Sequence, residues 1–194
     1  MVRKEDADSD APDRLMEEAA TLIRAQHDLR AFEPIYRHYY RPVFEYCYRR
    51  LGEREWAADA SSQVFTKALA GIHGFRSGSV AGWLFTIARN TVIDAVRTHR
   101  PHQSLDAVFG LSAGAPSPDE QAIANDQRRT LSAALDRLTF EQREIVELRW
   151  AGLTGPEIAA TLDLSLTAVK SGQYRAYARL RTLLAGEDLL GDVR

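Results

Sequence analysis

The chain has 194 residues, of which 45% are hydrophobic and 27% charged, as is ordinary for a soluble globular protein with a core of limited size. No apolar run approaches the roughly 18 residues that cross a bilayer, and the N-terminus has no apolar secretory signal. The cysteines for a disulfide framework or a cysteine-based zinc site are also lacking, so a cytoplasmic location is the default expectation. The net charge of −2 hides two basic blocks: residues 31–100 carry 10 basic and 6 acidic side chains, and residues 166–182 carry 4 basic and none acidic.

Helical periodicity dominates the N-terminal part of the chain, and no stretch alternates apolar and polar residues as strands do. The first 13 residues, five of them acidic, are expected to be a disordered tail. Pro42 cannot donate to a helix ladder and offers a point of interruption, while Gly52 is a natural C-cap. The predicted helices run from about Asp13 to Arg24, from Ala31 to Leu51, from Arg54 to Ile72 and from Val80 to Thr98.

The composition changes at residues 101–118, where three prolines, two glycines and three serines predict a flexible linker between two domains. Helical patterns resume beyond the linker. Two capping boxes, Thr139 with Gln142 and Thr154 with Glu157, mark new helix starts. The predicted helices cover about residues 119–138, from Thr139 to just before Gly152, from Thr154 to Leu162, and from Leu166 to Leu184, with a short tail over residues 186–194.

Residues 155–181 have the spacing of a helix-turn-helix, whose second helix meets base edges in the major groove. Ile158, Leu164 and Val169 are expected to pack inside, and Asp163 tolerates the left-handed backbone of the turn. A helical hairpin that binds another protein is the alternative, but one-sided positive charge favours DNA. The candidate DNA contacts are Ser165, which also caps the helix, and Thr167, Ala168, Lys170, Ser171, Gln173, Tyr174, Arg175 and Arg179.

A second candidate surface lies on the helix that ends near Thr98. Asn90, Asp94 and Arg97 are spaced by four and three residues, so they share one helix face that can read base edges and phosphates. Arg100 extends this face with positive charge. A surface ion pair between Asp94 and Arg97 is the alternative reading of the same spacing.

Residues 32–48 contain seven aromatic side chains interleaved with arginines. This mixture suits stacking on single-stranded bases, but the helical spacing of Phe32, Tyr36, Tyr39 and Tyr46 favours core packing for most of them. No metal-binding, phosphate-loop or paired-histidine motif is present. Cys47 has apolar neighbours and is predicted to be structural. We therefore expect no metal, no cofactor and no catalytic residue.

The combined motifs resemble those of bacterial RNA polymerase sigma factors of the extracytoplasmic-function group over about residues 30–184. The segments AFEPIYRHYYRPVFEYCYRRLG, ADASSQVFTKAL and GWLFTIARNTVIDAVR resemble the σ2 domain of that group. The segment from ALDRLTFEQREIVELRW through the helix-turn-helix resembles the σ4 domain. The resemblance departs at Ser62, Gln63 and Gly172, where the group often has glutamine, an acidic residue and arginine.

This resemblance implies an all-α chain of two small helical domains, a σ2-like bundle over 14–100 and a σ4-like helix-turn-helix domain over 119–185. It implies a promoter-specificity subunit without catalysis of its own, which binds core RNA polymerase through the β′ coiled coil and the β flap, recognises promoter DNA and helps to melt it. An anti-sigma factor is a further partner common in the group, and no membrane span is expected. The implied polymerase contacts are Asp59, Ser62, Gln63 and Phe65. The implied contacts to the −10 promoter element are Phe75, Arg76, Ser77, Asn90, Asp94, Arg97 and Arg100. The helix over 166–181 corresponds to the reader of the −35 element.

Three other functions remain open on the sequence. A helix-turn-helix regulator with a ligand-sensing N-terminal half would bind a palindrome alone as a dimer. An all-helical enzyme would need a pocket with converging polar groups within residues 31–100. An adaptor bundle would bind only protein.

Overall fold

The computed structural model describes residues 11–99, here called the N-terminal half, and residues 129–191, the C-terminal half. Every regular element in these two ranges is a helix, as predicted. The N-terminal half contains α1 (Ala11–Ala25), the 3-10 helix η1 (Leu29–Phe32), α2 (Glu33–Leu51), α3 (Arg54–Gly71), the 3-10 helix η2 (Ile72–Gly74) and α4 (Val80–His99). The C-terminal half contains a helix over 129–136, then α6 (Phe140–Trp150), α7 (Gly155–Leu162) and α8 (Leu166–Gly191). The predicted linker and residues 1–10 of the predicted N-terminal tail fall outside the described residues, whereas residues 11–13 of that tail already belong to α1.

The expected interruption at Pro42 is absent, because α2 continues through it from Glu33 to Leu51. An internal proline costs a helix roughly 3 kcal/mol. Burial of Tyr39 and Val43 on either side of Pro42 offsets this cost by fixing both halves of the helix against the core. The helix ends as predicted at Gly52, whose φ of 75° lets its N–H reach the carbonyl of Tyr48.

Both predicted capping boxes are confirmed, at Thr139 for α6 and at Thr154 for α7. The predicted end of the last helix at Leu184 is wrong, since α8 continues to Gly191. Gly186 lowers helix propensity by only about 1 kcal/mol relative to alanine. No proline follows it, so the backbone ladder has no reason to break there.

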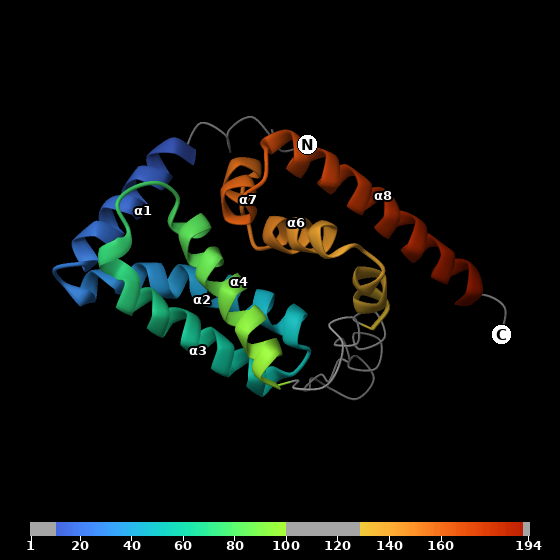
Figure 1. Cartoon of the computed structure of the whole chain (residues 1–194), viewed down its shortest axis with the longest axis horizontal. Coiled ribbons are helices and arrows are strands. Elements are labelled where there is room, and N and C mark those ends of the chain that lie inside the picture. Colours follow the sequence, from blue (N-terminus) through green and yellow to red (C-terminus); the bar gives the residue numbers. More distant parts are fainter. Residues whose placement is uncertain (1–10, 100–128, 192–194) are drawn as a thin grey trace, which may run out of the picture.

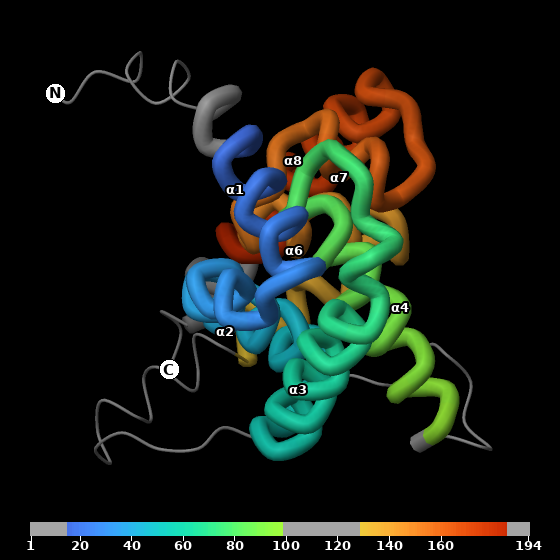
Figure 2. The backbone as a smooth tube through the Cα atoms, turned by 90° about the vertical axis from the view of Figure 1, so that its left-hand side faces the viewer, coloured from blue at the N-terminus to red at the C-terminus, as the bar shows by residue number. Residues whose placement is uncertain are grey.

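The two halves pack against each other in the described structure (Figure 1). Helices α1 to α4 form a bundle, and α7 lies against α4 while α6 faces α2 and α4. In Figure 2, α1 and α2 lie on the left and α4 on the right, with α7 above α4. One apolar cluster contains buried side chains of both halves, among them Tyr46, Leu84 and Phe85 from the first and Leu148 and Ile158 from the second.

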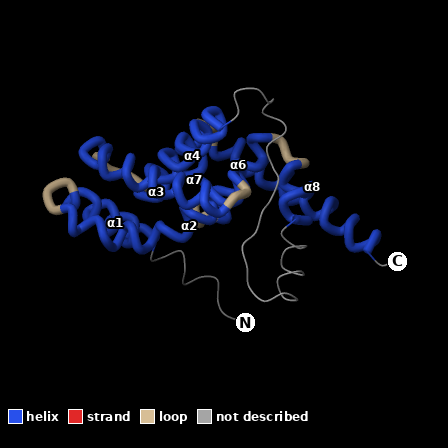
Figure 3. Tube along the Cα trace, turned by 90° about the horizontal axis from the view of Figure 1, so that it is seen from below, coloured by secondary structure: helices blue, strands red, loops and turns tan. Residues whose placement is uncertain are grey.

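A second, smaller cluster belongs to the C-terminal half alone. It joins Leu135 of the helix over 129–136, Val146 of α6, and Ala176 and Leu180 of α8. In Figure 3 the far end of α8 extends beyond the other helices. The start of α8 lies beside α7, and its middle packs on α6. The division into two independently folded domains stays a prediction.

Candidate nucleic-acid interface

The helix-turn-helix has the predicted internal packing. Ile158 and Val169 are fully buried, and Leu164 is half-buried between them at the turn. Asp163 adopts φ 55°, the left-handed conformation that its short side chain tolerates. The hydroxyl of Ser165 accepts a hydrogen bond from the N–H of Ala168 at 3.1 Å and so caps α8 as predicted. These contacts fix the angle at which α8 leaves the motif.

The predicted DNA-contacting residues gather on the exposed side of α8. The side chain of Tyr174 is 78% exposed, which makes it the most prominent aromatic of this helix. Ala168, Ser171 and Gln173 are half-buried, and Gln173 accepts a long hydrogen bond of 3.4 Å from Arg149. The exposed members are Ser165, Thr167, Lys170, Tyr174, Arg175 and Arg179. In the described part of the chain, no carboxylate pairs with Lys170, Arg175 or Arg179, so these cations are available to phosphates.

The loop before α4 divides into exposed and buried parts. Arg76 and Ser77 are exposed, as a DNA contact requires. Phe75 is only 4% exposed, and its ring packs edge-to-face against Trp83 at 5.6 Å between ring centres. Gln26 donates a hydrogen bond of 2.8 Å to the Phe75 carbonyl and ties this loop to the end of α1. Phe75 therefore shapes the loop from beneath and does not present its ring to solvent.

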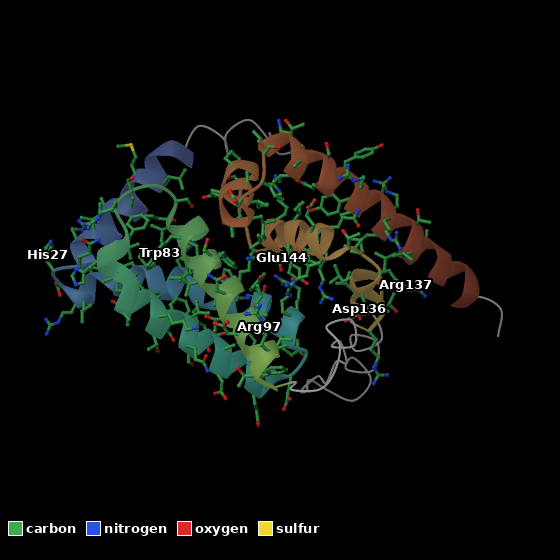
Figure 4. The ribbon with its side chains drawn as sticks, in the orientation of Figure 1. His27, Trp83, Arg97, Asp136, Arg137 and Glu144 are labelled. Atoms are coloured by element: carbon green, nitrogen blue, oxygen red, sulfur yellow. The ribbon has the colours of Figure 1, made fainter. Side chains whose placement is uncertain are left out.

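The predicted face of α4 is assembled as expected. Asn90, Asp94 and Arg97 are all exposed, and Figure 4 shows Arg97 near the C-terminal end of the helix. Asp94 does not pair with Arg97, which was the alternative reading of this spacing, but with Lys67 of α3, with 3.6 Å between Oδ2 and Nζ. This exposed pair is weak and leaves Arg97 open to phosphates. Arg100 lies outside the described residues.

The predicted polymerase-binding residues lie on α3. Asp59, Ser62 and Gln63 form an exposed polar face, whereas Phe65 is 4% exposed. The Phe65 ring contacts Tyr36 of α2, with ring centres 4.8 Å apart. Phe65 therefore joins α3 to α2 and supports the polar face from within.

The aromatic residues of α2 divide between core and surface. Tyr39 and Tyr46 are buried, as predicted, and Phe32 is buried in η1. A row on the opposite side of α2 remains partly exposed, with Tyr36 at 43% and Tyr40 at 40%. The row continues through Phe44 to Tyr48, whose rings are nearly parallel with centres 6.1 Å apart. This row lies beside the polar face of α3 and gives the surface an apolar border.

An ion network between the two halves was not predicted from the sequence. The Arg50 side chain, 6% exposed, pairs with Glu144 and with Glu147, the latter at 3.2 Å. Arg89 of α4 pairs with Glu144 at 2.6 Å, and Arg143 pairs with Glu147 at 2.7 Å. Arg143 also donates to the carbonyl of Arg49 at 2.9 Å. Figure 4 shows Glu144 on α6 at the junction of the halves.

The sequence holds a weak signal for this network. Glu144 and Glu147 are three residues apart within EIVEL, so they share a face of a helix whose neighbouring residues are apolar. Two carboxylates on an apolar face indicate buried cationic partners, but they do not say which arginine of the chain supplies them.

Burial acts in opposite directions on the pKa values of Arg50 and Asp136. Burial alone would lower the pKa of Arg50, but the charges of Glu147, Tyr46 and Glu144 outweigh it and raise that pKa. Burial raises the pKa of Asp136, against the opposing charge of Arg143, which it contacts at 2.6 Å. The guanidinium of Arg50 is therefore charged at all accessible pH values.

Two kinds of feature are absent from the described residues. Among residues 11–99 and 129–191, no three histidine, cysteine, aspartate or glutamate side chains are grouped so that they could hold a metal ion. No helix in the described part of the chain combines the length and apolarity that a membrane span requires.

Comparisons with known proteins match both halves. Residues 35–102 match the family described as Sigma-70 region 2, and residues 128–180 match Sigma-70, region 4. The ECF RNA polymerase sigma factor SigK of Mycobacterium tuberculosis is 30% identical, with 89% of this chain and 97% of SigK covered. The ECF RNA polymerase sigma factor BldN of Streptomyces coelicolor is 33% identical, with 94% of this chain and 70% of BldN covered.

Solved structures give the same picture. RpoE of Bartonella quintana, in complex with the anti-sigma factor NepR, superimposes with a TM-score of 0.62 at 28% identity, covering 79% of this chain and 96% of RpoE. CnrH, in complex with the cytosolic domain of CnrY, superimposes with a TM-score of 0.68 at 22% identity, covering 87% of this chain and 97% of CnrH. The latter likeness concerns the fold alone.

Proposed function

The chain belongs to the extracytoplasmic-function family of RNA polymerase sigma factors, and we propose that it acts as a promoter-specificity subunit of that polymerase. In this role it binds core RNA polymerase, reads the −35 and −10 promoter elements and promotes melting of the DNA. The polymerase supplies catalysis, and the sigma factor supplies binding and placement. Such a protein works in the cytoplasm, where promoter DNA and polymerase are found.

The exposed cationic face of α8 is the observation that carries this proposal. Lys170, Arg175 and Arg179 are all exposed along the second helix of a helix-turn-helix, with no carboxylate partner among the described residues. The first turns of such a helix enter the major groove, and flanking cations contact phosphates. We assign the −35 element to this face.

The N-terminal half is assigned to the −10 element and to core polymerase. Arg76 and Ser77 of the loop, with Asn90, Asp94 and Arg97 of α4, would contact the −10 element. Phe75 would support the loop from beneath. The exposed polar face of α3, formed by Asp59, Ser62 and Gln63 and supported by Phe65, would dock on the β′ coiled coil.

Transcription reconstituted with purified core polymerase tests the proposal. We expect the chain with core polymerase to initiate at a promoter that contains a matched −35 and −10 pair. Lys170→Ala and Arg175→Ala should each weaken promoter binding roughly three- to tenfold, as the loss of one phosphate or base contact does. Arg30→Ala, which removes an exposed arginine far from α8, should leave binding unchanged.

A gel shift without polymerase separates this function from that of an ordinary helix-turn-helix regulator. We expect the free chain to bind duplex DNA poorly. Tight binding of a palindrome by a dimer without polymerase would favour the regulator. Retention of transcription when Lys170 and Arg175 are both replaced would argue against the assigned orientation of that helix.

An anti-sigma factor is the proposed second partner. RpoE, at 28% identity, is described in complex with the anti-sigma factor NepR, and the relation of this chain to RpoE extends over both halves. A protein that co-purifies with the chain and represses transcription in the reconstituted assay would support this partner. Transcription should recover when that protein is removed.

A further inference from the structure

A single glutamine directly after α1 holds the loop that carries Arg76 and Ser77. The amide nitrogen of Gln26 donates one hydrogen bond to the carbonyl of Ile72 at 2.9 Å and another to the carbonyl of Phe75 at 2.8 Å. Both protons of the amide are thereby used. The two acceptors lie 46 and 49 residues beyond Gln26 in the sequence, in the segment that leads into α4 and passes beside α1 (Figure 1).

The geometry of η2 explains why these two carbonyls take an outside donor. Carbonyls at a helix end lack a full set of partners inside the helix. The Ile72 carbonyl accepts the N–H of Phe75 at 3.1 Å and has a second lone pair for the Gln26 amide. Phe75 is extended, with φ −72° and ψ 125°, so its carbonyl does not continue the turn. Gln26 therefore bridges both ends of the turn and fixes the direction in which the chain leaves it.

Buried side chains support this contact from both sides. Leu22 and Ala25 of α1 are fully buried just before Gln26. Ile72 is 1% exposed and Phe75 4% exposed, so the backbone that carries the two acceptor oxygens is also anchored in the core. Groups that are already held in place lose little further freedom when they form hydrogen bonds. We call the Gln26 amide and its two acceptor carbonyls the clamp.

The far end of the loop is fixed as well. The hydroxyl of Ser79 accepts the N–H of Gly82 at 3.0 Å and so caps the start of α4. Arg76 and Ser77 are exposed between the clamp and this cap, next to Gly78, whose φ of 100° turns the chain. A loop held at both ends needs little further ordering when it binds a ligand.

We propose, resting on the function proposed above, that Gln26 is a positioning residue for reading the −10 element. It acts through the loop, because its two hydrogen bonds hold Arg76 and Ser77 where the −10 element meets them. Selectivity among −10 sequences therefore depends on a side chain that lies outside both the loop and α4. Contacts to the −35 element come from α8 and do not depend on the clamp.

Two substitutions remove the donors while keeping the size of the side chain. Gln26→Met keeps the unbranched shape without any N–H group. Gln26→Glu keeps the shape and sets carboxylate oxygens against the two carbonyls. Neither changes a buried apolar residue, since Gln26 is half-buried. His27→Met is the matched control, at the adjacent exposed position that Figure 4 shows beside the end of α1.

Selectivity is measured with the holoenzyme, as the ratio of transcription from a promoter that it uses to transcription from the same promoter with a scrambled −10 element. We expect Gln26→Met to lower this ratio roughly three- to tenfold, as the loss of about one net hydrogen bond predicts. Gln26→Glu should lower it at least as far, and His27→Met should leave it unchanged. The matching ratio for a scrambled −35 element should stay constant in every variant.

This pair of ratios separates positioning from a general loss of structure. A variant that merely folds less well lowers transcription from all promoters alike and leaves both ratios where they were. That outcome would overturn the proposal.

A double-mutant cycle tests whether Gln26 acts through the loop. In a chain that already carries Arg76→Ala and Ser77→Ala, the clamp has no reading side chains left to place. Gln26→Met should then have no further effect on the −10 ratio. An effect as large as in the unmodified loop would show that Gln26 acts elsewhere, and the proposal would fail.

Hydrogen exchange of the free chain examines the clamp without polymerase or DNA. The N–H of Phe75 donates within the turn, and the N–H of Trp83 donates to the carbonyl of Ser79 at 3.1 Å at the other end of the loop. In Gln26→Met we expect exchange at Phe75 to be at least about tenfold faster and exchange at Trp83 to be unchanged. Equal exchange at Phe75 would overturn the clamp. A holoenzyme indifferent to the −10 element would instead refute the proposed function, whatever the exchange rates.

Discussion

Cys47 lies in the core of the N-terminal half with no exposed surface, as the sequence predicted for a structural cysteine. Burial raises the pKa of its thiol to about 11 from an ordinary value near 9. The folded state therefore prefers the protonated thiol. The associated stabilisation is complete below about pH 9 and disappears as the pH rises toward 11, by about 3 kcal/mol in total.

The first prediction concerns the reactivity of this thiol. Because the thiolate is the reactive species and the side chain is enclosed, Cys47 should not react with a disulfide reagent at pH 8 in native buffer. One thiol per chain should react after denaturation. Rapid reaction in native buffer would show that the N-terminal core opens easily, and the Cys47→Ala variant provides the blank.

Single residues also show where sequence reasoning succeeds. The left-handed backbone of Asp163 and the hydroxyl cap of Ser165 follow from the intrinsic chemistry of those residue types, so both were predictable. Phe75 was grouped with exposed neighbours although it is buried, because burial depends on Trp83 and Gln26, which contact it from other parts of the fold. Local chemistry fixes a cap, whereas only tertiary contacts fix which side of a loop faces the core.

At the scale of elements, Gly172 explains how α8 approaches α6. A Cβ atom at this position would lie 2.5 Å from Cδ1 of Ile145, a residue of α6 that is fully buried. The glycine therefore permits a close crossing of the two helices, and the position faces the core of the C-terminal half. A glycine here costs helix propensity, but the packing that it allows compensates.

The second prediction follows from this crossing. Gly172→Leu should lower the free energy of unfolding by about 1–3 kcal/mol, because overpacking outweighs the gain of about 1 kcal/mol in helix propensity. Urea denaturation provides the measurement. Gly71→Leu, at an exposed helix end with no neighbour within 4 Å, is the matched control and should change stability little. A Gly172→Leu variant as stable as the unmodified chain would refute the role of close packing.

Helix starts were more predictable than helix ends. The capping boxes at Thr139 and Thr154 each contain their own hydrogen-bonding partners within four residues, so the sequence alone indicates them. The end of α8 has no such signal: Gly186 resembles a stop, yet the helix continues to Gly191. The path of α2 through Pro42 was likewise hidden, since packing on both sides of the proline outweighs the lost hydrogen bond.

At the scale of the whole molecule, the contact between the halves could not be predicted. Arg50 and its partners Glu144 and Glu147 are nearly 100 residues apart, and nothing local connects them. A linker composition indicates that two halves can separate, but it contains no information on whether they also pack. The exposure of the cations of α8 was predictable for the opposite reason, because the apolar positions follow helical periodicity and leave Lys170, Arg175 and Arg179 outside the buried stripe.

The third prediction tests whether this contact makes the two halves unfold together. Arg50→Met keeps the length of the side chain but leaves Glu144 and Glu147 buried with one cation fewer. Breaking a buried pair in this way should lower the free energy of unfolding by about 3–5 kcal/mol. Since Arg50 connects α2 to α6, the loss should fall on the coupling between the halves as well as on their total stability.

Differential scanning calorimetry measures both effects. The unmodified chain should unfold in one cooperative transition, whereas Arg50→Met should show two, with the earlier transition well below that of the unmodified chain. Arg41→Met makes the same change in the same helix, at an arginine whose side chain is 87% exposed and pairs with Glu45 alone, and it should leave a single transition at nearly the original temperature. If Arg50→Met also unfolds in one transition at that temperature, the buried charges contribute nothing to joining the halves, and the shared apolar cluster alone must hold them together.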